Sequence, residues 1–163
     1  MVRKAHMTRF AEPGLYRQFL PIRDDRGGAA VEFGILAPLF LMLVLGIVQF
    51  ALTFADYMFL TSAVMAGSQT LSVSRGITSP FTSTVNAMVA SAPLLTPTQL
   101  KANITITVNG AACATDSACV TKLNSAAGDV AVVTARYPCD LSIFGVNYVP
   151  GCTLASQVAQ IVQ

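Results

Sequence analysis

The feature that most constrains this chain is an uncharged apolar run near its N-terminus. From Phe33 to Ala55 there is no charged residue, and Gln49 is the only strongly polar one. These 23 residues exceed the roughly 20 that an α-helix needs to cross a bilayer. A soluble core helix of this length would carry a polar stripe, which the run lacks. The run therefore predicts a membrane-spanning helix, in which Pro38 would introduce a kink or a local opening.

A secretory signal peptide is the alternative interpretation of the run. Such a signal has an apolar region of about 7–15 residues followed by an A-x-A-like cleavage site. This run is longer and follows a basic leader, and the nearest candidate, Ala63-Val64-Met65-Ala66, matches such a site poorly. We therefore expect an anchor that stays in the membrane.

Composition and charge agree with an anchored protein. The 163-residue chain is 53% hydrophobic and only 11% charged, against about 25% charged in globular domains. A net charge of +2 is too small to indicate nucleic-acid binding. Six of the ten basic residues precede the run: Arg3, Lys4, Arg9, Arg17, Arg23 and Arg26. By the positive-inside rule, the N-terminus is expected in the cytoplasm and the C-terminal part across the membrane.

The helix is expected to continue beyond the bilayer. An apolar stripe with alternating three- and four-residue spacing follows Asp56: Tyr57, Leu60, Val64, Gly67 and Leu71. Arg75-Gly76 is a typical helix stop. The stripe would pack either on the protein's own C-terminal domain or on a neighbouring subunit.

Helical patterns give way to strand patterns in the C-terminal part. Ser79-Pro80 starts a short helix over 80–92, and a proline-containing capping box at 96–99 starts a further turn ending near Lys101. Strands are expected at 104–108, 120–123, 129–137 and 153–162, with a turn at Asn109-Gly110 and a loop over 138–152. The predicted fold is a membrane-anchored α+β protein with a three- or four-stranded antiparallel sheet. Its expected domains are a leader (1–27), the long helix (28–75) and an extracytoplasmic domain (76–163).

Four cysteines lie in the predicted extracytoplasmic domain, where disulfides persist. Three pairings are possible. We favour Cys113–Cys119 and Cys139–Cys152, because each pair closes a short loop. The alternatives are a zinc site or free thiols, but this part has no C-x-x-C and no histidine, so no metal is expected.

The residues do not predict an enzyme. The only histidine, His6, lies in the leader, so a Ser–His catalytic arrangement has no base in the C-terminal part. No phosphate-binding glycine pattern is present, and no cofactor is expected. The chemically distinctive residue is Glu32, a carboxylate at the edge of the apolar run, where ionisable groups are costly and tend to be functional. Its simpler role would be to complement the helix dipole.

The membrane boundary reads Arg26-Gly27-Gly28-Ala29-Ala30-Val31-Glu32-Phe33 and continues through Gly34-Ile35-Leu36-Ala37-Pro38-Leu39. This stretch resembles the TadE-like family, the minor pseudopilins of the tight-adherence (Flp) type IV pilus system. The resemblance is strong over about 23–75 and weaker in the C-terminal part. The family often has Ala at the first mature position, whereas this chain has Gly28, which is also small.

This resemblance implies a bacterial inner-membrane protein that is processed between Gly27 and Gly28 by a prepilin peptidase. Glu32 and Phe33 would serve peptidase recognition and subunit docking, with Glu32 meeting the new amine of a neighbouring subunit. The implied partners are the peptidase, other pilins and pseudopilins, the assembly platform and the lipid bilayer. The alternative is a permanently anchored extracytoplasmic binding module that keeps residues 1–27.

Overall fold

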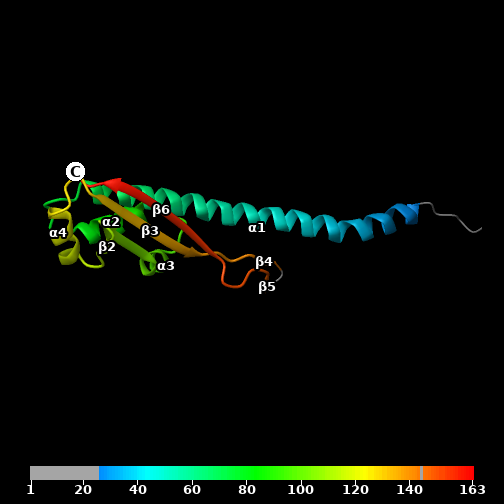
Figure 1. Cartoon of the computed structure of the whole chain (residues 1–163). Coiled ribbons are helices and arrows are strands. Elements are labelled where there is room, and N and C mark those ends of the chain that lie inside the picture. The colour runs from blue at the N-terminus through cyan, green and yellow to red at the C-terminus, as the bar shows by residue number, and fades with distance from the viewer. Residues whose placement is uncertain (1–25, 144) are drawn as a thin grey trace, which may run out of the picture. The chain divides into compact units, whose positions relative to one another are not determined.

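A computed structural model describes residues 26–143 and 145–163 of the chain (Figure 1). The predicted leader lies outside the described residues as far as position 25. The chain divides into two units, Met1–Pro38 and Leu39–Gln163. The functional boundaries at 27/28 and 75/76 remain predictions.

The described residues form four helices and six strands. The helices are α1 (Arg26–Ser72), α2 (Pro80–Ala90), α3 (Pro97–Ala102) and α4 (Asp116–Asn124). The strands are β1 (Ile104–Val108), β2 (Ala111–Ala112), β3 (Val130–Pro138), β4 (Ser142–Ile143), β5 (Val146–Asn147) and β6 (Thr153–Ile161). Strands β2-β1-β3-β6 form an antiparallel sheet in that order, and β4 and β5 form a separate two-stranded hairpin. The predicted α+β class with a small antiparallel sheet is confirmed.

Alternating side chains fix the register of the main sheet. Ile106 and Val108 of β1 are buried, and Ile106 pairs with the buried Val133 of β3. The predicted turn follows β1: Asn109 and Gly110 have φ of 48° and 75°, values that a two-residue hairpin turn requires and that Asn-Gly favours. One face of the sheet is thereby directed into the core.

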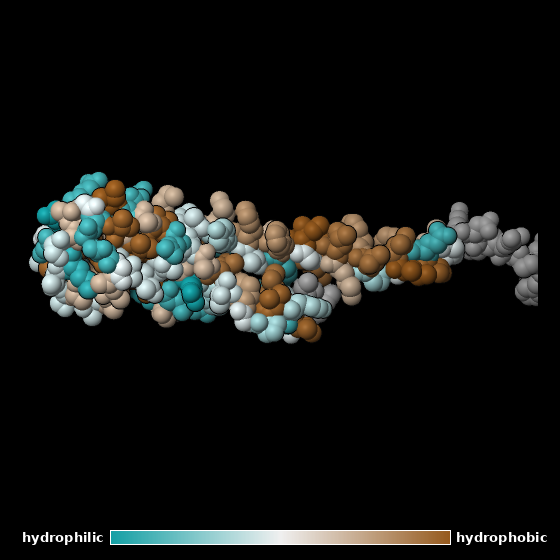
Figure 2. All heavy atoms as spheres, viewed as in Figure 1, coloured by the Kyte–Doolittle hydropathy of each residue, from teal (hydrophilic) through white to brown (hydrophobic). Residues whose placement is uncertain are grey.

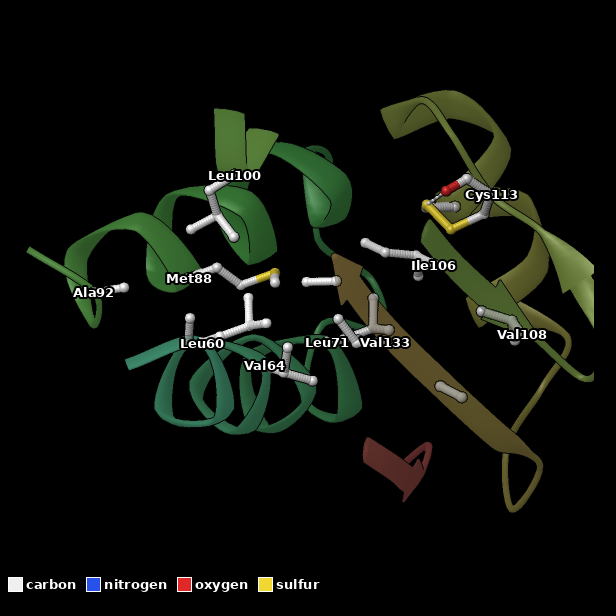
Figure 3. Packing of buried hydrophobic residues seen from close by; sticks show 14 of the residues in the cluster. Leu60, Val64, Leu71, Met88, Ala92, Leu100, Ile106, Val108, Cys113 and Val133 are labelled. Atoms are coloured by element: carbon white, nitrogen blue, oxygen red, sulfur yellow. Dashed lines mark hydrogen bonds between the residues drawn. A yellow bond between two sulfur atoms is a disulfide. The ribbon is translucent and has the colours of Figure 1, made fainter. Parts of the chain in front are cut away.

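The predicted apolar stripe of α1 packs on the protein's own domain. Leu60, Val64 and Leu71 are fully buried, and Figure 3 shows them pointing toward Met88 of α2 and Val133 of β3. Tyr57, the first member of the predicted stripe, is instead 40% exposed. The stripe therefore packs against the domain only from Leu60 onward.

The long helix ends at Ser72, three residues before the predicted end at Arg75. The hydroxyl of Ser74 donates to the carbonyl of Thr70 at 2.5 Å, and the amide of Ser74 donates to the carbonyl of Leu71 at 3.1 Å. These bonds close the last turn early, because a serine hydroxyl competes for carbonyls that would otherwise bond the next helical amides. Gly76, at φ 75°, lies in the connection that follows.

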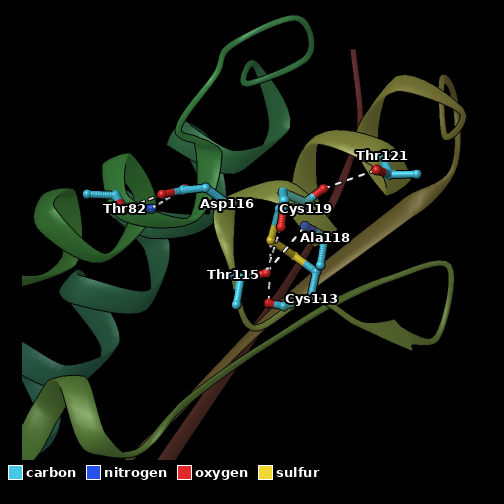
Figure 4. Close-up of a disulfide and its surroundings, with 8 residues drawn as sticks. Thr82, Cys113, Thr115, Asp116, Ala118, Cys119 and Thr121 are labelled. Carbon is cyan, nitrogen blue, oxygen red and sulfur yellow. Dashed lines mark hydrogen bonds between the residues drawn. A yellow bond between two sulfur atoms is a disulfide. The ribbon is translucent and has the colours of Figure 1, made fainter.

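The strand predicted over residues 120–123 is wrong, because this segment belongs to α4. Thr115 is the N-cap, and its hydroxyl oxygen accepts a hydrogen bond from the amide of Ala118 at 3.3 Å. Asp116 lies in the first turn, where an acidic group suits the helix dipole. Its carboxylate accepts hydrogen bonds from the amide and hydroxyl of Thr82 at 2.9 and 2.6 Å, which ties α4 to α2 (Figure 4).

Two smaller expectations also need correction. Thr96 is the N-cap of α3, but its side chain makes no capping hydrogen bond, so the predicted capping box is not formed. The loop predicted over 138–152 contains the β4–β5 hairpin.

The structure contains both disulfides that the loop lengths favour. Cys113 pairs with Cys119 and Cys139 with Cys152, with Cα–Cα distances of 5.0 and 5.2 Å. The first joins the start of α4 to the segment after β2 (Figure 4). The second closes the segment that connects β3 to β6.

Candidate functional site

The predicted processing segment forms the first turns of α1. Gly27, Gly28, Glu32 and Phe33 are all exposed, Phe33 at 72%. A Cβ added at Gly27 or Gly28 would meet nothing within 4 Å. Glycine in a helix costs about 1 kcal/mol relative to alanine, so packing within this chain gives no reason for two glycines here.

No residue of the apolar run of α1 is buried in the structure. Its most apolar 18-residue window has a mean hydropathy of 2.5, and none of that window is buried. The core helix of a soluble protein would be largely buried, whereas Figure 2 shows hydrophobic side chains on the surface of this helix. Among the described residues this is one helix long and apolar enough to cross a membrane, consistent with a single anchor.

Hydroxyl groups near the end of the run are satisfied by the helix itself. Thr53 donates to the carbonyl of Gln49 at 3.1 Å, and Thr61 donates to that of Tyr57 at 2.9 Å. Because each hydroxyl has a partner four residues earlier, neither needs water as an acceptor.

Helix α1 also continues through Pro38.

A cleft of about 360 Å³ lies beside the last two turns of the apolar run. It is lined by Gln49, Leu52, Thr53 and Asp56 of α1 and by Gln99, Tyr137, Pro138, Cys139 and Asp140. The sequence predictions did not include this cleft. The spacing of Gln49, Thr53 and Asp56 places them on one helix face, which is the signal that could have indicated a polar contact there.

The chemistry available in the cleft is limited to hydrogen bonding and two carboxylates, those of Asp56 and Asp140. Over residues 26–143 and 145–163, no group of three or more His, Cys, Asp or Glu side chains comes together as metal ligands would. Glu32 and Phe33 follow Gly28 by about one turn of α1, and both side chains are exposed.

The family model described as TadE-like protein matches residues 27–69, which lie almost entirely within α1. Over these residues the chain is similar to TadE-like proteins. The resemblance carried by the boundary motif is thus confirmed. TadE-like proteins are associated with pilus assembly and are not known as enzymes. No curated protein and no solved structure matches the chain.

The TadE-like match covers the anchor and the first part of the helix stripe but not the sheet. It begins at Gly27, so the paired glycines, Glu32 and Phe33 all belong to the family segment. The β-sheet domain and its disulfides lie outside the matched residues.

Proposed function

We propose that this TadE-like protein is a minor pseudopilin of the tight-adherence pilus machinery. Its leader would be removed between Gly27 and Gly28 by a membrane-embedded prepilin peptidase. The observation that carries this proposal is the family segment 27–69, which begins at the expected cleavage point and continues as an exposed apolar helix. The C-terminal domain would lie on the extracytoplasmic side, as the basic leader suggests.

The exposed glycine pair supports recognition by a peptidase. A scissile bond must be extended to enter a protease cleft, whereas the Gly27–Gly28 bond lies in the first turn of α1. Two glycines lower the free-energy cost of unwinding this turn, because each disfavours the helix by about 1 kcal/mol relative to alanine. The open space around both residues leaves the turn free of side-chain packing that unwinding would break.

Glu32 fits a docking role after processing. It would become the fifth residue of the mature chain, and the new amine of Gly28 on a neighbouring subunit would be its counter-charge. A carboxylate at the lipid boundary is costly alone and becomes worthwhile when it is matched. Such pairing would set the register of one subunit against the next.

The experiment is N-terminal sequencing of the full-length protein purified from membranes with and without the prepilin peptidase. We expect a chain starting at Gly28 only when the peptidase is present, and accumulation of uncut protein for Gly27→Leu. The matched control is Gly34→Leu, which changes an equally open glycine of the same helix and should be cut normally. An intact leader in both membranes refutes the proposal and favours a permanently anchored binding module.

The role of Glu32 is tested separately with Glu32→Gln. If Glu32 serves docking, this variant is cut normally but is lost from the fraction that crosslinks to pilins or other pseudopilins. If Glu32 serves peptidase recognition, uncut protein accumulates instead. Normal cutting together with normal crosslinking would leave only the helix-dipole role.

A further inference from the structure

The main sheet is oriented so that one end lies beside the apolar run of α1. The amide of Gln163, just after β6, donates to the carbonyl of Ser72 at 2.9 Å, which places the end of β6 at the end of α1. Strand β3 pairs antiparallel with β6, and its last residues line the cleft beside Gln49 and Asp56. Strand β3 therefore runs back along α1 toward the membrane-spanning segment.

The segment that follows β3 is a closed loop, the Cys139–Cys152 loop (residues 139–152). The disulfide and a hydrogen bond from the amide of Cys139 to the carbonyl of Cys152, at 3.1 Å, hold its two ends together. Within it, the amide of Tyr148 donates to the carbonyl of Leu141 at 3.2 Å. These bonds hold the two ends of the loop, and strands β4 and β5 lie beyond the end of β3 (Figure 1).

This loop exposes apolar side chains where the polar surface of a domain would be expected. Val146, Tyr148 and Val149 are 56%, 64% and 45% exposed, and Asp140, at the base of the loop, is its one charged residue. Figure 2 shows hydrophobic surface at this hairpin as well as on α1.

We propose that residues 145–149 of the Cys139–Cys152 loop dock on the lipid bilayer beside α1, with Val146, Tyr148 and Val149 in the headgroup region. The bilayer is the occupant that the geometry favours, because the loop lies at the level where the apolar run of α1 ends. Tyrosine is enriched at this depth, where its ring contacts lipid and its hydroxyl contacts water. Asp140 lines the polar cleft above the loop and stays on the aqueous side. The inference depends on membrane anchoring by α1 and not on a role in a pilus.

The chain contains no tryptophan, so a single introduced tryptophan reports its own depth. Full-length Tyr148→Trp is reconstituted into phosphatidylethanolamine–phosphatidylglycerol vesicles with or without bromine on the acyl chains. We expect a blue-shifted emission and a loss of fluorescence in the brominated vesicles. Ile77→Trp is the matched control: Ile77 is 42% exposed and follows α1 at the other end of the domain, so its emission should not be quenched. Val146→Trp serves in the same way if Tyr148→Trp does not fold.

A third variant, Phe50→Trp, distinguishes failure of the anchor from failure of the loop proposal. Phe50 is 71% exposed within the apolar run, so its tryptophan should be quenched whenever α1 spans the bilayer. Quenching at Phe50 with none at Tyr148 overturns the loop proposal and leaves the anchor intact. A blue shift at Tyr148 without quenching, increasing with protein density, also overturns it and indicates contact with a neighbouring subunit. Absence of quenching at all three positions refutes the anchor, and the loop proposal with it.

Discussion

The contact between α1 and α2 makes a prediction about Gly67. Gly67 is buried, and a Cβ added there would lie 2.9 Å from Sδ of Met88, closer still to its Cγ, and 3.4 Å from Cγ2 of Thr84. Both neighbouring side chains are fully buried, so they have little room to move. Glycine at this position allows the two helices to approach each other closely.

The expected effect of Gly67→Ala is the sum of two opposing terms. Alanine gains about 1 kcal/mol in helix propensity, and overpacking a dense core costs about 1–3 kcal/mol. We therefore expect a net loss of about 0–2 kcal/mol in the free energy of unfolding. Because this range reaches zero, the single variant does not decide the question.

A double-mutant cycle with Met88→Ala provides the decisive measurement. Met88→Ala alone should cost about 2–5 kcal/mol, but it removes the Cγ and Sδ atoms that collide with the new Cβ. In that background Gly67→Ala should become stabilising, which gives a coupling free energy of about 1–3 kcal/mol. The free energy of unfolding is measured on the full chain in mild detergent by pulse proteolysis across a urea series.

The control for this cycle is Gly46→Ala, since a Cβ at Gly46 meets nothing within 4 Å. This change should not destabilise the domain and should show no coupling to Met88→Ala. Additivity of Gly67→Ala and Met88→Ala within about 0.5 kcal/mol would refute the close packing of α1 on α2.

Two further predictions concern the bonds that fasten the domain. Hydrogen bonds from the hydroxyl and amide of Thr82 lower the pKa of Asp116. The stabilisation that these bonds give is therefore fully present above the ordinary Asp pKa and is lost as the pH falls through the lowered pKa of the folded state. Asp116→Asn should reduce this loss of stability at acid pH, measured as urea midpoints over a pH series, and an unchanged pH dependence would contradict the prediction. Replacing Cys139 and Cys152 together by serine should lower the free energy of unfolding by about 3 kcal/mol, because closing a loop of this 13-residue separation removes about that much chain entropy from the unfolded state. A loss below about 1 kcal/mol would show that the loop is constrained without the disulfide.

Local patterns in the sequence predicted most of the regular elements correctly. Strand β1 consists of β-branched residues and is followed by Asn109-Gly110, so its bounds and its turn both follow from neighbouring residues. The cysteine pairs followed from their short separations. The strand predicted over 153–162 matches β6, in which Leu154 and Val158 are half-buried, and Val162 just after it is buried.

The misassigned elements depend on side-chain bonds that apolar spacing does not reveal. The apolar residues of the segment 120–123 favour a strand when taken alone, whereas the Thr115 cap starts helix α4 ahead of them. Its carboxylate contact joins Asp116 to Thr82, 34 residues away in sequence. The cleft beside α1 likewise combines residues near 50, 99 and 138, a combination that no local pattern contains.

The candidate site was predicted from a sequence resemblance, and only part of that prediction concerns contacts within the fold. The resemblance in the boundary motif identified the segment that the family model matches, and packing within the chain does not require glycine at Gly27 or Gly28. Cleavage at Gly27 and docking through Glu32 remain predictions, because both need a partner that is not part of this fold.

Within the unit Leu39–Gln163, helix α1 passes from an exposed apolar segment to a segment packed in the domain core, with no linker between them. Its residues up to about Ala55 expose apolar side chains, whereas from Leu60 onward one stripe is buried under the sheet and α2. Only about one helical turn separates the two patterns, so the domain is fixed directly on the end of its anchor. A displacement of the domain relative to the bilayer must therefore move α1 itself, or break the packing around Leu60 and Val64. Contact of the Cys139–Cys152 loop with lipid would add a second attachment beside the helix and so restrict the tilt of α1.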